Sequence, residues 1–468
     1  MRVSWKALAL TFSFLMLQPA IIPPSHGQTE TGYVSVHNSF YVHTPGMFYD
    51  YVWCISVLSL DDNNHVTIYQ LPEGKIVGEA DLSFKQVFRY NGSETDPKYF
   101  KITSTKPVSV SLHGGQINAP ASWQMGWGQG STFYSAVDGK LVGKRFIFTP
   151  MPNNRTYISG LFDLSAPVVF AVEDSQIKLY GPYGIIDEWF MFAGTSRQLS
   201  QIPAHDVYTL ESTGKVLIGT FNGDSLTVVP STSGELLGRE FITRPAIQSL
   251  PENANITMGG IIVFAYEDCQ VSIFSLSERT LLKSLTLANG EYSFISDLPF
   301  YEISPQEYAP RDIYVTSTGT ISVWAASARG AIMLGNLGDD VTFLAGSGTL
   351  RFYAPSYAII FSPEKTTFEL DGSSVEIEKD GYMRTTGGYH EVQTSKPLIV
   401  QVVALHHVMG QGSGPNSFCS VALSVDTATP EAPGKEGVFD FTLIGIAAAV
   451  AIVVVIVFVK KGRKRGKV

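Results

Sequence analysis

Short runs in which apolar and polar residues alternate dominate the chain between its two ends. Phe170–Tyr180 and Phe264–Phe274 are typical, with Val, Ile, Leu, Tyr or Phe at alternate positions. A period of two indicates strands that bury one face. Gly, Pro, Asn and Asp interrupt the runs roughly every 8–12 residues, and no convincing apolar period of 3.6 is present. The pattern predicts an all-β fold.

The strand pattern recurs four times, at intervals of about 100 residues, a length that can bury its own core. Each recurrence opens with a strand that ends in proline: Tyr41–Pro45, Phe146–Pro150, Phe241–Pro245 and Arg351–Pro355. A strand pair with a Ser/Thr turn follows in each, marked by residues 104, 212, 317 and 394. We therefore predict four tandem β-sandwich-like units over 28–145, 146–240, 241–350 and 351–425. The alternative is a β-propeller in which each unit supplies more than one blade.

Both ends of the chain are specialised. Arg2 and Lys6 precede a short apolar run, which predicts a signal peptide over 1–27. A polar Pro/Thr segment over 426–440 reads as a stalk. The uncharged residues 441–459 are long enough to cross a bilayer as a helix, and the basic tail 460–468 follows the positive-inside rule. We expect a single-pass plasma-membrane protein, with an extracellular ectodomain and a short cytoplasmic tail.

The charge balance limits the partners. The formal net charge is −9, and setting aside the six basic residues of the tail and the two near the N-terminus leaves −17. A nucleic-acid-binding protein shows a basic patch, and none is visible, so nucleic acid is not an expected partner. The expected partners are membrane lipid, through the helix, and an extracellular protein or glycan.

The second half of the first unit resembles the N-terminal domain of the IgG-Fc-binding-protein type of surface protein. The resemblance is carried by Lys101–Val110, Ser131–Ser135 and Gly139–Phe146. It implies extracellular, non-catalytic adhesion, and no residue matches an antibody-binding function. The layout of signal segment, β-units and basic tail is also similar to that of membrane-anchored envelope proteins of prokaryotes, notably archaea.

Two groups of residues suggest metal binding. Acidic pairs recur at the predicted hairpin tips, at positions 61–62, 173–174 and 267–268, and Ca²⁺ prefers such oxygen ligands. Neighbouring residues at a strand end point apart, however, so polar turns are the favoured interpretation. His113, His406 and His407 precede glycine-rich stretches, but adjacent histidines on a strand face opposite sides. We expect no metal and no cofactor.

Other residues suggest contact or processing. Trp123 and Trp127 lie in a glycine-rich stretch without strand alternation and are candidate partner-contact residues. Three sequons, at Asn91, Asn154 and Asn255, are candidate glycosylation sites. A disulfide between Cys54 and Cys419 would join the first unit to the last, which leaves Cys269 over.

No nucleophile elbow, zinc-protease helix, phosphate-binding loop or dinucleotide fingerprint is present. The sequence therefore favours a non-enzymatic protein of adhesion or envelope structure. The alternatives are an extracellular glycoside hydrolase, which would need two carboxylates across a cleft, and a ligand-binding receptor ectodomain.

Overall fold

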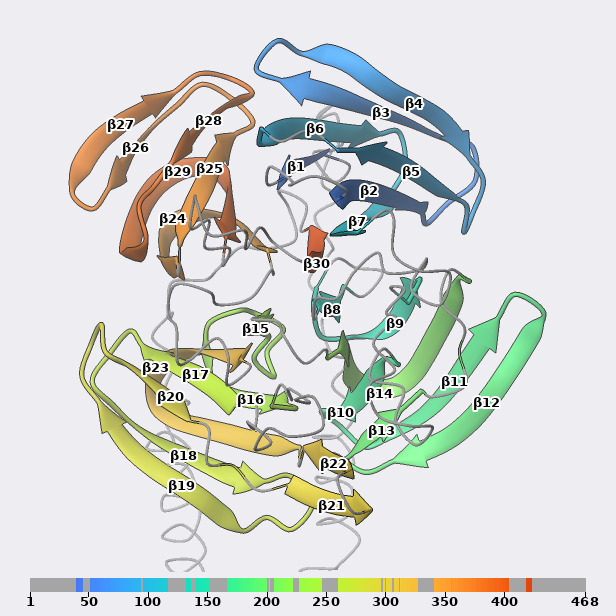
Figure 1. Cartoon of the computed structure of the whole chain (residues 1–468), viewed down its shortest axis with the longest axis vertical. Coiled ribbons are helices and arrows are strands. Elements are labelled where there is room, and N and C mark those ends of the chain that lie inside the picture. Colours follow the sequence, from blue (N-terminus) through green and yellow to red (C-terminus); the bar gives the residue numbers. More distant parts are fainter. Residues whose placement is uncertain are drawn as a thin grey trace, which may run out of the picture. The chain divides into compact units, whose positions relative to one another are not determined.

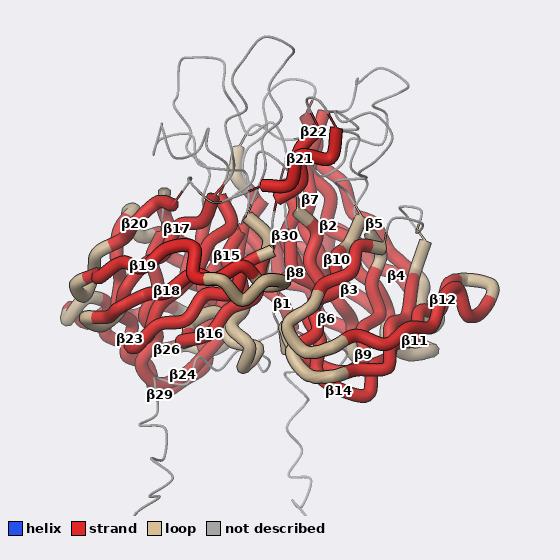
Figure 2. The backbone as a smooth tube through the Cα atoms, turned by 90° about the horizontal axis from the view of Figure 1, so that it is seen from below, coloured by secondary structure: helices blue, strands red, loops and turns tan. Residues whose placement is uncertain are grey.

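The computed structural model describes residues 39–44, 51–93, 96–116, 132–135, 140–150, 166–199, 202, 206–221, 227–245, 260–295, 298, 300–304, 307–310, 312–326, 341–354, 356–403 and 418–422. These residues form strands and their connections, which confirms the all-β prediction (Figures 1 and 2). No helix among them is long and apolar enough to cross a membrane. The predicted signal peptide, stalk, helix and tail lie outside the described residues.

Two four-stranded antiparallel sheets form the first repeat, in the orders β1-β6-β3-β4 and β30-β7-β2-β5 (Figure 1). Their strands are β1 (Ser39–Thr44), β2 (Tyr51–Ser59), β3 (Asn64–Leu71), β4 (Lys75–Leu82), β5 (Val87–Gly92), β6 (Lys98–Ser104), β7 (Val108–Gln116) and β30 (Phe418–Ala422). Pro107 has no N–H to donate, which fits a break in the ladder between β6 and β7.

The second and third repeats each contain one seven-stranded sheet of the same design. The second contains β8 (Thr132–Tyr134), β9 (Gly143–Phe148), β10 (Val168–Ala171), β11 (Ser175–Gly181), β12 (Gly184–Met191), β13 (Ser196–Gln198) and β14 (Tyr208–Thr220). The third contains β15 (Thr227–Val229), β16 (Gly238–Thr243), β17 (Gly260–Ala265), β18 (Cys269–Ser275), β19 (Leu281–Leu287), β20 (Tyr292–Ile295) and β23 (Ile313–Ala326). In the second repeat, the first half of the longest strand, β14, pairs mainly with β9 and β11, and its second half pairs with β8 and β10. In the third repeat, β23 pairs in the same way, first with β16 and β18 and then with β15 and β17.

The fourth repeat is a six-stranded sheet built around one long strand. It consists of β24 (Val341–Ala354), β25 (Tyr357–Ser362), β26 (Thr366–Leu370), β27 (Ser373–Ile377), β28 (Gly381–Arg384) and β29 (Gly388–Val403). β24 pairs with β29 along almost its whole length, with one irregularity between Gly346 and Gly348. A separate two-stranded sheet contains β21 (Phe300–Ser304) and β22 (Glu307–Pro310).

One turn has the same geometry in all four repeats. The backbone N–H groups of Lys85, Gly194, Gly290 and Asp380 donate to carbonyl groups at the ends of β2, β10, β17 and β25. All four residues have positive φ, between 59° and 80°. Glycine adopts this conformation freely, whereas a side chain is strained there. The recurrence of this turn supports four structurally equivalent repeats.

The recurring Ser/Thr positions are explained by a second shared turn. The hydroxyl groups of Ser104, Ser212 and Thr394 each donate to the carbonyl oxygen two residues later, at 2.7–2.9 Å. At the equivalent place in the third repeat, Ser317 Oγ accepts from the N–H of Gly319 at 3.3 Å. A short hydroxylated side chain is favoured here because it satisfies a backbone group within the bend.

The boundaries expected at 145/146 and 240/241 do not coincide with those of the sheets. β8 lies before the first boundary but pairs with β14, and β15 lies before the second but pairs with β23. The corresponding place in the first repeat is filled by β30, the last strand of the described chain, which pairs with β7 (Figure 1). In sequence, β8 and β15 thus lie before the boundaries expected for the repeats whose sheets they complete, and β30 lies far beyond the first repeat, whose sheet it completes.

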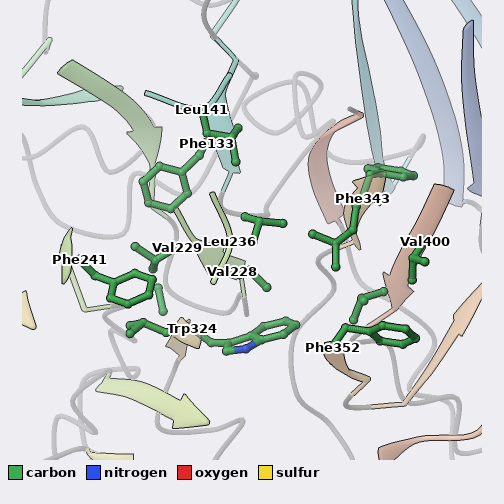
Figure 3. Close-up of a cluster of buried hydrophobic side chains, with 14 of the residues drawn as sticks. Phe133, Leu141, Val228, Val229, Leu236, Phe241, Trp324, Phe343, Phe352 and Val400 are labelled. Carbon is green, nitrogen blue, oxygen red and sulfur yellow. The ribbon is translucent and has the colours of Figure 1, made fainter. Parts of the chain in front are cut away.

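The apolar core is shared in the same way. Its larger cluster includes Trp53 of the first repeat, Phe170 of the second, Phe264 of the third and Phe352 of the fourth. Figure 3 shows part of it, where Phe133 and Leu141 lie near Val229. A smaller cluster belongs to the second repeat alone. The repeats therefore do not each have a separate core.

Polar contacts join the fourth repeat to the first. Asp380 accepts a hydrogen bond of 2.6 Å from the Tyr41 hydroxyl and pairs at 2.7 Å with Lys101 Nζ. The buried Gln401 amide bonds to both backbone groups of His43 in β1, through its own oxygen and nitrogen. Asp380 occupies the positive-φ turn position that is glycine in two other repeats, so its carboxylate links the two repeats at some cost in backbone strain.

Candidate functional site

The hairpin formed by β11 and β12 carries most of the large apolar side chains that are exposed in the described part of the chain. Tyr183, at its turn, is fully exposed, and Phe190 and Phe192 are 52% and 66% exposed. The two phenyl rings meet edge to face, with centroids 5.0 Å apart. Figure 2 shows the hairpin projecting from its sheet. Exposed apolar groupings of this kind mark interaction sites.

The register determines which residues share the outer face of this hairpin. Opposite pairs on that face are Gln176 with Phe190, Lys178 with Glu188 and Tyr180 with Ile185. Side chains at alternate positions point the other way, where Ile177, Leu179 and Met191 belong to the core of the second repeat. β12 therefore carries apolar side chains on both faces. Those on the outer face are not members of the core cluster.

Charges on the hairpin are paired. Lys178 Nζ lies 3.4 Å from Glu188 Oε1 across the two strands. On β12, Asp187 pairs at 2.6 Å with Arg197, and the guanidinium of Arg197 lies 4.3 Å from the centroid of the Trp189 ring. Such exposed ion pairs add little stability, but they leave the outer face with one cation beside one anion.

Comparison among the repeats shows that the phenylalanines are specific to the second. Strands β4, β12, β19 and β27 each end on a buried apolar residue, namely Leu82, Met191, Leu287 and Ile377. The residues immediately before these are Asp81, Phe190, Thr286 and Glu376, and those immediately after are Ser83, Phe192, Ala288 and Glu378. Where the second repeat has two exposed phenylalanines, the others have polar or small residues.

The far end of the hairpin is different, since its exposed aliphatic residue is a shared feature. Ile185 lies opposite Tyr180, as Ile76 lies opposite Tyr69 and Leu281 opposite Phe274. Aromatic–aliphatic pairs across two strands stabilise a hairpin directly. Exposure at Ile185 is therefore part of the common architecture, whereas exposure at Phe190 and Phe192 is not.

The acidic residues at the hairpin tips have structural roles. Carboxylate oxygens of Asp62, Asp174 and Asp268 accept backbone N–H groups of Phe84, Ala193 and Asn289, at 2.8–2.9 Å. Each donor immediately precedes the positive-φ residue of the shared turn. Among the described residues, no group of three His, Cys, Asp or Glu side chains is placed to hold a metal ion. These carboxylates are thus used to fix turns, as the polar-turn interpretation expects.

A buried polar cluster lies between β2 and β7. Ser56 Oγ lies 3.0 Å from His113 Nε2 and 3.5 Å from Cys54 Sγ. All three residues are at most 5% exposed. A serine and a histidine at this distance have the spacing of a nucleophile and its base, but a substrate would have to reach them. We interpret the cluster as structural.

Cys54 should not react with iodoacetamide in the folded protein at pH 8. Burial raises the pKa of its thiol to about 11, so only about one molecule in a thousand would carry a thiolate at that pH. The measurement is mass spectrometry of the peptide that contains Cys54, after alkylation with and without guanidinium chloride. Rapid labelling without denaturant would contradict this expectation.

The predicted disulfide between Cys54 and Cys419 is not formed. Cys54 is a free thiol. Both cysteines are register partners of His113, from opposite sides of β7. Their Cα atoms are therefore separated by two strand spacings, roughly 9.5 Å, which exceeds the reach of a disulfide. The last described strand, β30, joins the first repeat by backbone pairing with β7 instead.

The other predicted residues are placed as follows. Asn91 lies on β5 and is exposed, so its sequon is accessible, and its glycosylation stays a prediction. Trp123 and Trp127 lie outside the described residues, as do Asn154 and Asn255. The same is true of His406 and His407.

The sequence contained a signal for the hairpin that periodicity alone does not reveal. In Gly184–Met191, large apolar residues occupy both alternating sets of positions. Such a run is also typical of a fully buried strand. The exposed set could have been identified by aligning the four strand ends, because only the second repeat has phenylalanine where Asp81, Thr286 and Glu376 stand in the others.

Comparisons with known proteins add little. No protein-family model and no curated protein matches the chain. Among solved structures, the Cupin 2 conserved barrel domain protein from Leptotrichia buccalis is 12% identical and the match covers 38% of this chain and 81% of that one, with a TM-score of 0.13. The arabinofuranosyltransferase AftD from Mycobacteria is 9% identical and the match covers 81% of this chain and 33% of that one, with a TM-score of 0.11. Neither likeness supports an inference about fold or function.

Proposed function

We propose that this chain is a membrane-anchored surface protein whose β-repeats bind without catalysis, in adhesion or in building the cell envelope. The observation that carries the proposal is the exposure of Phe190 and Phe192 on the second hairpin, where the equivalent residues of the other repeats are polar or small. Bulky apolar side chains are costly to leave in water, and exposed clusters of them are typical of contact surfaces.

In this proposal the extracellular part is one body of four curled repeats, held together by β30, rather than four independent sandwiches on a string. The signal segment and the helix predicted over 441–459 would place this body outside the cell. The hydrolase alternative is less well supported, because the carboxylates of Asp62, Asp174 and Asp268 serve turns. The Ser56–His113 pair is buried.

The double substitution Phe190→Thr with Phe192→Ala should weaken attachment roughly tenfold or more, because exposed aromatic anchors are commonly worth 1–2 kcal/mol or more each (about tenfold per 1.4 kcal/mol). Both replacements are the residues found at these places in the third repeat. The measurement uses cells that display the full chain. It determines what fraction of them is retained on envelopes prepared from cells that naturally carry the protein. Stability should change by less than about 0.5 kcal/mol, since both side chains are exposed.

Leu281→Thr is the matched control, since Leu281 is 58% exposed on the equivalent hairpin of the third repeat. It should leave attachment unchanged. Protease added to the intact cells should release the ectodomain. Equal attachment of the double variant and the wild type, or an ectodomain protected until lysis, would overturn the proposal.

A further inference from the structure

We propose that the outer face of the β11–β12 hairpin binds the same face of a second copy of this chain, across a two-fold axis that runs parallel to the strands. This inference rests on the proposed function and names the partner of the same surface. The observation that carries it is which residues of β11 lie opposite which residues of β12.

A two-fold axis midway between β11 and β12 places β11 of one copy over β12 of the other. Each residue then faces the residue that is its register partner within its own chain. Lys178 would face Glu188 of the second copy, and Glu188 would face Lys178 in return. The face is self-complementary in charge for this reason.

The same operation matches the apolar residues. Tyr180 would face Ile185 of the second copy, and Phe190 would face Gln176, whose side-chain amide already bonds to Glu188 Oε1 at 3.4 Å. Phe192 lies beside Phe190 and would extend the apolar contact at the base of the hairpin. Large side chains would be covered without burying an unmatched charge.

The equivalent faces of the other repeats lack this complementarity. In the fourth repeat, the same operation would place Glu369 opposite Ser374 and Glu376 opposite Thr367, so no opposite-charge pair would form between copies. In the first repeat, β4 presents Glu79 and Asp81 at the corresponding places, with His65 as their partner. The third has Ser272 opposite Ser284, which offers neither a charge pair nor apolar area. Only the second hairpin combines an opposite-charge pair with exposed aromatic residues.

A single hairpin offers less than the roughly 800 Å² per partner of a standard stable complex. The contact should therefore be weak in dilute solution and stronger between chains held in one membrane, where anchoring raises the effective concentration. The predicted helix over 441–459 would hold copies in this way. The test therefore uses the full chain in lipid vesicles.

In the experiment, two pools of the full chain carry different fluorescent labels. Energy transfer between the labels measures how closely the copies associate. Wild-type pools should give a strong signal. Lys178→Glu alone places glutamate opposite glutamate, and Glu188→Lys alone places lysine opposite lysine, so each variant by itself should lose about tenfold in association. A mixture of the two single variants should associate again, because each then meets the opposite charge. The double variant K178E/E188K, which keeps an ion pair within each chain, should also associate.

The mixture decides between a second copy and other partners. A mixed pool that stays as weak as each single variant would overturn the inference. If the mixed pool fails but the double variant F190T/F192A still loses attachment to envelopes, the proposed function stands and the partner is a different protein or a glycan. If vesicles show association that ignores all of these substitutions, the contact lies elsewhere on the chain and the inference is wrong. Equal thermal midpoints for every variant confirm that each is folded.

Discussion

Replacing Trp53 by alanine should lower the free energy of unfolding by about 3–5 kcal/mol, the range for large aromatic residues removed from a core. Trp53 is fully buried. Its ring packs against Tyr90 and Phe100, with centroid distances of 5.7 and 5.3 Å. Because its cluster includes residues of all four repeats, the loss should appear in one cooperative transition. The measurement is urea denaturation of the purified protein.

Two control variants separate packing from other effects. Trp53→Phe should cost much less, because it keeps an aromatic ring and because the buried indole nitrogen has no hydrogen-bond acceptor among the described residues. Tyr183→Ala should change stability by less than about 0.5 kcal/mol, since that side chain is fully exposed. A small effect of Trp53→Ala would show that the first repeat is not part of the common core.

Raising the pH from 9 to 11 should destabilise the protein by about 4 kcal/mol through three tyrosines alone. Burial raises the pKa of Tyr41, Tyr266 and Tyr357 well above the usual 10, and the Asp380 carboxylate raises that of Tyr41 further. Below pH 10 each hydroxyl is protonated in both the folded and the unfolded states. Above it, the unfolded chain releases a proton that the folded chain keeps, so stability falls until the folded pKa is reached. At pH 11 each tyrosine therefore lowers the free energy of unfolding by about 1.4 kcal/mol.

The dependence is checked with thermal melts at pH 9, 10 and 11. Tyr266→Phe should reduce the slope of stability against pH by roughly a third of this contribution. It also loses the contact between the tyrosine hydroxyl and Ser322 Oγ, so the slope is the informative quantity and not the absolute midpoint. A flat profile up to pH 11 would contradict the burial of these hydroxyl groups.

Local features of the fold were predictable from the sequence because their causes are local. The openers near Tyr41, Phe146, Phe241 and Arg351 are strands in the structure, within β1, β9, β16 and β24. The Ser/Thr marks correspond to one recurring bend whose hydroxyl satisfies a nearby backbone group. Alternation and turn chemistry depend on neighbours in the chain, so one sequence suffices to find them.

The pairing of distant strands was not predictable in the same way. The pattern of residues 418–422 does not specify β7 as the strand with which β30 pairs. The sequence suggested that Cys54 and Cys419 join the first unit to the last, but it could not show that β7 lies between them, with His113 opposite both cysteines. The candidate site was missed for a related reason. Whether Phe190 faces water or core depends on what covers it, which its own alternation does not encode.

The position of β30 also sets the order in which the protein can be completed during synthesis. β7 ends at Gln116, yet the strand that pairs with its free side begins at Phe418. At translation rates of about 5–20 residues per second, this edge of β7 remains unpaired for roughly 15 to 60 seconds. An open strand edge is a template for wrong pairing with other chains. The sheet that is made first is finished last, so a nascent chain should depend on a chaperone at its first repeat until its final strand emerges.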